Sequence, residues 1–186
     1  IDELAQRAGI DELQFRLANM KNNPRLTEAT ELVATKAGWG KALPEGHFHG
    51  LATHSSFGSA VAQIAEVSVE GTKIVVHKVT AAIHCGLVVN PGIVRDAVEG
   101  GIIFGLTAAL HGEITLVDGV IQQSNFHSYP MLRMADAPKV EVHIVESQEH
   151  PEGVGEPGLP PLAPAVANAV FKASGQRLRD LPLRLS

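Results

Sequence analysis

The sequence has 186 residues, of which 45% are hydrophobic and 19% charged, and a formal net charge of −5. These values are typical of a globular chain with a buried core, and they argue against a disordered chain and against a nucleic-acid-binding surface. No apolar stretch is long and uninterrupted enough to span a bilayer, and a single cysteine, Cys85, excludes an internal disulfide and a cysteine-only zinc site.

The first 38 residues predict a helical N-terminal segment. The opening IDELAQRAG lacks Met and reads as the middle of a helix, so we expect a piece of a larger polypeptide. Gly9 and Gly38 stand where glycine commonly ends a helix, and Pro24 stands where proline commonly begins one. Nothing in this segment suggests chemistry. We expect residues 39–186 to form a separate α+β portion.

The α+β portion is expected to begin with a loop over residues 39–59, which carries Trp39, Pro44 and several Gly and His. Residues 59–70 and 73–85 are rich in β-branched residues and predict two strands joined as a hairpin across Gly71. The second strand is almost continuously apolar, which indicates burial on both faces.

Two helices rich in Ala and Gly are predicted after this hairpin. The first begins with Asn90 as cap and carries three glycines, which persist inside a helix where a backbone or ligand comes close; they are Gly100, Gly101 and Gly105. A second hairpin is expected at Asp118-Gly119, then a strand KVEVHIV, and a last helix begun by Pro164 and ended by Gly175. The fold class is α+β, with N-terminal helices followed by β-hairpins packed against these two helices.

The segment GVGEPGLPPLAP places one carboxylate, Glu156, in a constrained backbone. Pro157 disfavours a helical conformation at Glu156, and Gly153 and Gly155 permit positive φ beside it. A general base needs fixed geometry first and a suitable pKa second, so this frame suits such a role. An exposed acid in a surface loop explains the same residues equally well.

At these residues the sequence resembles a known family. The stretch GVGEPGLPPLAPAVANAVF is similar to the C-terminal active-site segment of the xanthine dehydrogenase and aldehyde oxidase superfamily of molybdenum hydroxylases. Residues 85–134 are similar to the preceding segment in the branch of isoquinoline 1-oxidoreductase β-subunits and membrane-associated aldehyde dehydrogenases. The resemblance runs from residue 1 to about residue 183. It implies that the chain is part of a molybdopterin-binding domain.

In that family the Glu of the GEP motif is the general base, and only Glu156 matches it. The resemblance implies oxidation of an aldehyde or hydroxylation of an N-heterocycle, with Glu156 deprotonating a molybdenum-bound hydroxyl and water supplying the oxygen. The implied cofactor is molybdenum–molybdopterin, with the cytosine dinucleotide form expected and none held by this chain alone, and no metal ligand is assigned here. Gly155, Gly100 and Gly101 are the residues expected to face the cofactor. Many relatives carry Gln where this chain has Ala97.

The resemblance also implies partners and a location. The partners are the rest of the large subunit, an iron–sulfur small subunit, a cytochrome c subunit in some relatives, and a small-molecule substrate, but no nucleic acid. A periplasmic or membrane-associated location is expected, with a cytoplasmic one left open. By itself the chain is expected to be inactive.

Two other functions fit the sequence. Ala97 favours a non-catalytic scaffold or interaction domain that keeps the fold without the cofactor. A hydrolase using Glu156 with zinc would need ligands from His47, His49 and His54, but no Asp, Glu or Cys at ligand spacing completes the set, Glu45 being merely nearby. Solvated loop histidines explain the pattern better.

Several remaining residues have both a functional and a structural interpretation. Polar groups in SSFGSA could meet a phosphate; these are Ser55, Ser56 and Gly58. His84 and Cys85 should point to opposite faces of a strand, which leaves Cys85 a buried, inert thiol. Large side chains before the strand KVEVHIV could line a substrate passage or pack in the core; these are Phe126, Tyr129, Met131, Arg133 and Met134. The last arginines should lie on a solvated surface or contact other domains; these are Arg177, Arg179 and Arg184.

Overall fold

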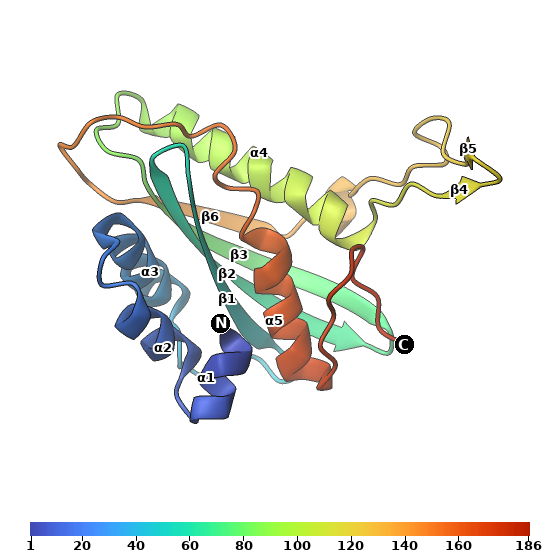
Figure 1. Cartoon of the computed structure of the whole chain (residues 1–186), viewed down its shortest axis with the longest axis horizontal. Coiled ribbons are helices and arrows are strands. Elements are labelled where there is room, and N and C mark those ends of the chain that lie inside the picture. Colours follow the sequence, from blue (N-terminus) through green and yellow to red (C-terminus); the bar gives the residue numbers. More distant parts are fainter.

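The computed structural model describes all 186 residues, and it contains helices and strands in alternating groups (Figure 1). In chain order the elements are α1 (Asp2–Ala8), α2 (Glu12–Asn19), α3 (Pro24–Ala37), β1 (Phe48–Ser56), β2 (Ser59–Glu70), β3 (Lys73–His84), α4 (Pro91–Leu110), β4 (Leu116–Val117), β5 (Val120–Ile121), the 3₁₀ turn η1 (Met134–Asp136), β6 (Lys139–Ile144) and α5 (Leu162–Ser174). The predicted α+β class is confirmed.

A four-stranded sheet in the order β1-β2-β3-β6 forms the centre of the molecule. The first three strands are antiparallel neighbours, and β6 pairs in parallel with the second half of β3, from Lys78 to Ile83. A parallel neighbour requires a crossover connection, and α4 lies within it. The sequence predicted the strand of β6 but not this pairing, because strand order depends on contacts far apart in the chain.

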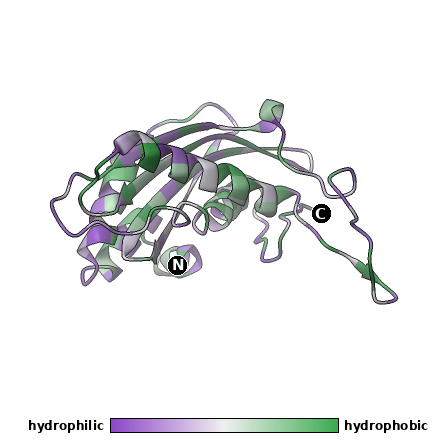
Figure 2. Cartoon of the chain, turned by 90° about the horizontal axis from the view of Figure 1, so that it is seen from above, coloured by the Kyte–Doolittle hydropathy of each residue, from purple (hydrophilic) through white to green (hydrophobic).

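Helices cover both faces of this sheet (Figures 1 and 2). Helices α4 and α5 pack on one face through a cluster of 19 buried residues, to which β2 contributes Val61, Ala65 and Val67. Helix α3 packs on the opposite face against Ala62 and Ile64 of the same strand. The alternation of these side chains follows from the two-residue period of a strand. Helix α3 of the N-terminal segment therefore shares its core with the sheet.

Most of the predicted turns and caps are confirmed. Gly9, Gly38 and Gly175 each end a helix with φ between 66° and 74°. The side chain of Asn90 accepts hydrogen bonds from the first turn of α4, and Gly71 turns β2 into β3 with φ of 63°. Because these signals act over a few residues, the sequence alone reveals them.

Two boundaries differ from the sequence prediction. Residues 48–56, expected to be part of a loop, form β1, an edge strand whose polar side chains hid the pattern. Helix α5 begins at Leu162 rather than Pro164. Pro164 lies in the first turn, where a backbone N–H would have no acceptor within the helix, so the lack of an N–H in proline removes no hydrogen bond.

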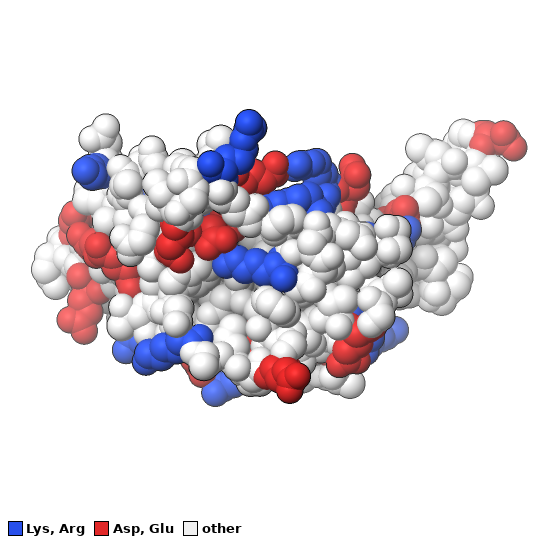
Figure 3. Space-filling model, turned by 90° about the horizontal axis from the view of Figure 1, so that it is seen from below, with Lys and Arg blue, Asp and Glu red and all other residues white.

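An arm extends from the end of α4 and carries the small hairpin of β4 and β5 (Figure 1). Its turn, Asp118-Gly119, is confirmed, and both residues have positive φ. Leu116 opposite Ile121 and Val117 opposite Val120 are all more than half exposed, so both faces of the hairpin are apolar. Lys, Arg, Asp and Glu are interspersed over the body of the molecule but almost absent from the arm (Figure 3). No helix of the chain has the length and apolar content required to cross a bilayer.

The terminal arginines bind partners within the chain, while Arg179 and Arg184 stay exposed, as expected of a solvated surface. Arg179 donates two hydrogen bonds to Glu3 at 2.7 and 3.0 Å, and Arg177 donates to Gln6 at 2.7 Å. Both partners belong to α1, so these contacts fasten the N-terminal helix to the last residues. Arg184 lies 2.5 Å from a carboxylate oxygen of Glu113.

One charge cluster makes the stability of the fold depend on pH. Glu141 on β6 accepts from Lys139 at 2.8 Å and Lys78 at 2.7 Å, and these contacts lower its pKa from 4.5 to about 2. A carboxyl whose pKa is lower in the folded state stabilises it above the unfolded value, and the contribution is lost as pH falls through the folded value. We therefore expect Glu141 to stabilise the fold above pH 4.5 and to lose this effect towards pH 2.

The variant Glu141→Gln checks this prediction in urea denaturation at several pH values. The free energy of unfolding should be lower than that of the wild type near neutral pH, and the two should converge as the pH falls towards about 2. Glu99→Gln, an exposed position on α4, is the matched control. A difference that stays constant with pH would contradict the assignment.

Candidate functional site

Glu156 lies in a segment without helix or strand, residues 145–161, between β6 and α5. Two earlier acids of this segment meet Arg25 of α3, with guanidinium nitrogens 2.6 Å from Glu149 and 3.9 Å from Glu152. Glu156 forms no ion pair with any residue of the chain and is exposed. Its carboxylate is therefore available to another group, as is that of Glu146, but Glu156 is the one framed by Gly155 and Pro157.

The turn between β1 and β2 holds the segment just before Glu156. The Gly153 N–H donates to the Phe57 carbonyl at 3.1 Å, and the Ser59 hydroxyl donates to the Gly153 carbonyl at 2.6 Å. A Cβ at Gly153 would lie 2.9 Å from that of Phe57. Neither Gly153 nor Gly155 has positive φ, which corrects the sequence prediction. Gly153 is required by the close approach of Phe57 instead.

Glu156 itself begins a tight turn. The Leu159 N–H donates to the Glu156 carbonyl at 2.9 Å, and Pro157 occupies the second position, which its fixed φ favours. This turn lies directly on α4, since a Cβ at Gly101 would be 3.4 Å from the Leu159 nitrogen and one at Gly105 3.2 Å from its carbonyl oxygen. The helix glycines thus admit another backbone, as the sequence predicted.

Gly158, two residues after Glu156, is fixed from two sides. A Cβ at this position would lie 3.0 Å from the carbonyl oxygen of Val98 on α4. The side-chain nitrogen of Gln63 on β2, fully buried, donates to the Gly158 carbonyl at 2.5 Å. Neither Ser59 nor Gln63 was assigned a role from the sequence, although Gln63 is the one amide within the apolar run of SAVAQIAEV.

Glu156 does not line any of the main cavities of this chain. Five cavities of about 230 to 680 Å³ are lined by other residues. The carboxylate instead projects from the turn beside Gly155, where a Cβ would meet no atom within 4 Å. The acid is therefore held close to the glycine-bearing helix but faces open space.

The three glycines expected to face a cofactor have different surroundings. Gly100 and Gly155 are exposed, and a Cβ on either would meet no atom within 4 Å. Gly101 faces the Leu159 backbone of the same chain. Gly100 and Gly155 leave room for an external group, and Gly101 already has a partner.

The three histidines considered for zinc do not converge; His49 and His54 belong to β1, and His47 lies just before it. His47 and His49 face the carboxylate of Glu66 on β2, at 2.7 and 4.0 Å, while His54 has the opposite parity along the strand. His47 also stacks on the ring of His77. Burial lowers the pKa of His49. No group of three or more His, Cys, Asp or Glu side chains is arranged to hold a metal ion.

The SSFGSA segment is the turn of a hairpin rather than a loop around a phosphate. Ser55 and Ser56 belong to β1. A Cβ at Gly58 would overlap the carboxylate of Glu152, and the Gly58 carbonyl accepts from Arg25 at 2.9 Å. A carboxylate at this place repels an anion, so the structure does not support the phosphate site.

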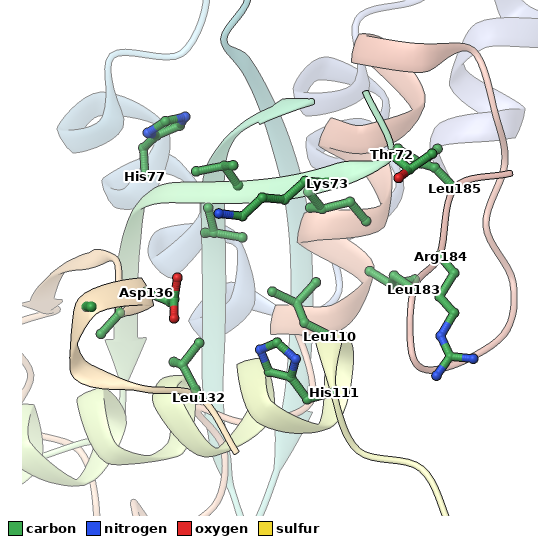
Figure 4. A pocket seen from close by; sticks show the side chains of 15 residues that line it. Thr72, Lys73, His77, Leu110, His111, Leu132, Asp136, Leu183, Arg184 and Leu185 are labelled. Atoms are coloured by element: carbon green, nitrogen blue, oxygen red, sulfur yellow. The ribbon is translucent and has the colours of Figure 1, made fainter. Parts of the chain in front are cut away.

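A cavity of about 680 Å³ lies between the start of β3, the end of α4 and the last residues of the chain (Figure 4). Its lining includes Lys73, His77, His111 and Asp136, but no hydrogen bond or ion pair joins these side chains. His77 is engaged by Ser68 at 2.7 Å. We assign no chemistry to this cavity.

The remaining candidates from the sequence are Cys85 and three large apolar side chains, and they differ in exposure. Cys85 is buried, and burial raises the pKa of its thiol, as expected of an inert cysteine. Phe126, Met131 and Met134 are 72%, 41% and 92% exposed, so packing in the core of this chain does not explain them.

Comparison with known proteins places these features in context. A family model described as a molybdopterin cofactor-binding domain matches residues 2–138, a range that ends before Glu156. The chain is 38% identical to isoquinoline 1-oxidoreductase subunit beta of Brevundimonas diminuta over 99% of its length and 24% of that protein. It is 33% identical to a membrane-bound aldehyde dehydrogenase of Gluconacetobacter polyoxogenes, over 99% of the chain and 26% of that protein.

A solved structure extends the likeness to the fold. The aldehyde oxidoreductase of Desulfovibrio desulfuricans superposes with a TM-score of 0.59 and 26% identity, over 67% of this chain and 14% of that one. The chain spans about a quarter of the length of the curated relatives. These matches confirm the resemblance found in the sequence.

Proposed function

We propose that this chain, which belongs to the family of molybdopterin cofactor-binding domains, is part of a molybdenum hydroxylase large subunit and supplies its general base, Glu156. One observation carries the proposal. The Glu156 carboxylate is unpaired and exposed on a tight turn fastened to both β2 and α4. A surface acid without a function would not need such a support, whereas a base requires fixed geometry.

The residues around Glu156 fit a bulky cofactor carrying its own metal. The chain offers no cluster of side chains that could ligate an ion, so molybdenum would be held through its organic cofactor. Gly155 and Gly100 leave open space in which a cofactor could approach the backbone closely. We propose these two glycines as cofactor contacts, and Gly101 as a contact made through its backbone only.

When bound, the molybdenum cofactor supplies the redox chemistry, as is general for cofactor enzymes. The contribution of this chain is to hold one carboxylate oxygen of Glu156 in place and let it accept a proton. The Glu156–Leu159 turn fixes the backbone at the acid, and the side chain keeps its freedom on the open side. The chain alone encloses no substrate, so we expect it to be inactive without the rest of the large subunit.

The relatives suggest the class of reaction and the partners. We propose oxidation of an aldehyde or hydroxylation of an N-heterocycle, with water as the oxygen source and the cytosine dinucleotide form of the cofactor. An iron–sulfur subunit and a cytochrome c subunit would receive the electrons. The relative named as membrane-bound supports a membrane-associated enzyme, for which we propose a periplasmic location.

The test uses the full-length protein that contains this chain. We expect stoichiometric molybdenum by elemental analysis and oxidation of an aldehyde or of isoquinoline. Heavy oxygen from labelled water should enter the isoquinoline product, a suitable probe because aldehydes exchange oxygen with water unaided. A folded protein without molybdenum would contradict the proposal and support the non-catalytic scaffold that Ala97 favours.

A further inference from the structure

Two buried polar side chains of β2 point at the segment that carries Glu156. The Ser59 hydroxyl donates to the Gly153 carbonyl at 2.6 Å, and the Gln63 amide donates to the Gly158 carbonyl at 2.5 Å. Ser59 is 1% exposed and Gln63 is 0% exposed. The two lie four residues apart on one strand and so project from the same face of the sheet.

The two carbonyls stand on either side of Glu156. Gly153 lies three residues before the acid and Gly158 two residues after it. No other side chain donates a hydrogen bond to the backbone between them. Helix α4 closes the opposite side of Gly158, since a Cβ there would touch Val98. The segment is therefore tied to the sheet at two points, with the acid between them.

The amide of Gln63 is not explained by stability alone. Its side-chain oxygen is buried and has no hydrogen-bond partner. A buried polar atom without a partner is unfavourable, and an apolar side chain of the same shape would avoid it. The amide nitrogen is thus kept despite this cost, and the group that it reaches is the Gly158 carbonyl.

We infer that Ser59 and Gln63 are positioning residues that fix Glu156 by holding the carbonyls of Gly153 and Gly158. We name this pair of hydrogen bonds the carbonyl clamp. The inference rests on the proposed role of Glu156 as the base. A displacement of about 1 Å at a reacting group can cost about a hundredfold in rate, so a clamp on either side of a base acts on turnover without touching substrate.

The test compares Ser59→Ala and Gln63→Met in the full-length, molybdenum-loaded enzyme. Each should lower kcat by about tenfold or more, because the carboxylate of Glu156 is no longer held in position. KM and molybdenum content should stay near wild type, because neither substitution touches the substrate or the cofactor. Amide hydrogen exchange at Leu159, whose N–H closes the turn on Glu156, should become faster. Ser68→Ala, a buried hydroxyl at the far end of the same strand, is the matched control and should change neither readout.

A failure of the carbonyl clamp and a failure of the proposed base give different results. If Glu156→Gln is inactive but both clamp variants keep the kcat and the exchange rate of Ser68→Ala, the inference is wrong. If Glu156→Gln retains full activity, the proposed function is wrong, and exchange at Leu159 still decides whether the clamp orders the turn. Should Gln63→Met fail to fold, Ser59→Ala alone decides, since it removes a single hydroxyl.

Discussion

Substituting Gly50 with alanine is expected to destabilise the chain severely. Gly50 lies on β1 directly under α5, and a Cβ there would overlap the carbonyl oxygen of Ala165 and the amide nitrogen of Ala169. Both obstacles are backbone atoms of a helix whose small side chains are themselves fully buried. Neither atom can move without displacing α5 from the sheet.

The expected cost follows from overpacking. Extra atoms in a packed core lower the free energy of unfolding by about 1–3 kcal/mol and occasionally more. A clash with rigid backbone should cost at least the upper value of this range. We expect Gly50→Ala to lower the free energy of unfolding by at least about 3 kcal/mol, which urea denaturation measures. Gly100→Ala is the matched control, because a Cβ there meets nothing and alanine favours the helix. Equal stability of the two variants would contradict this packing.

The second large effect is expected at Glu156. Glu156→Gln keeps the size of the side chain but removes its ability to accept a proton, and the loss of a positioned base typically costs about 10²–10⁴ in rate. We expect kcat of the full-length enzyme to fall within that range, with molybdenum content unchanged. Stability should change little, because the carboxylate is exposed and has no partner in the chain.

A matched control isolates this effect from general charge loss. Glu146→Gln removes an exposed acid of the same segment and should leave kcat near wild type. Retention of more than about a tenth of wild-type activity by Glu156→Gln would contradict its role as base, since a positioned base contributes at least a hundredfold.

The sequence predicted the local features of the fold well. Glycine ends, the Asn90 cap and the Gly71 turn depend on a few adjacent residues and were found where expected. Strand β1 was missed because Gly50 and the continuous polar run from Thr53 to Ser56 give no alternating or β-branched pattern, and its formation depends on pairing with β2 and packing under α5. Such contacts join residues far apart in the chain, and the hydrophobic periodicity of the sequence does not predict them.

In the candidate site, too, local features could be predicted from the sequence and long-range contacts could not. Glu156 was proposed as the base because proline and glycine frame it locally and because its segment resembles a family motif, and the helix glycines Gly101 and Gly105 proved to admit a backbone. The identity of that backbone, the turn after Glu156 itself, could not be deduced from one sequence. Ser59 and Gln63 were missed for the same reason, since they bind carbonyls that lie 94 and 95 positions further along the chain.

The most direct test of the account is the rate at which substrate reduces molybdenum in Glu156→Gln, measured without an electron acceptor and at equal molybdenum content. This single turnover isolates the step in which the base acts from later electron transfer. We expect this rate to be about 10²- to 10⁴-fold lower than that of the wild-type enzyme. A rate within tenfold of wild type would show that the carboxylate on this turn does not take the proton.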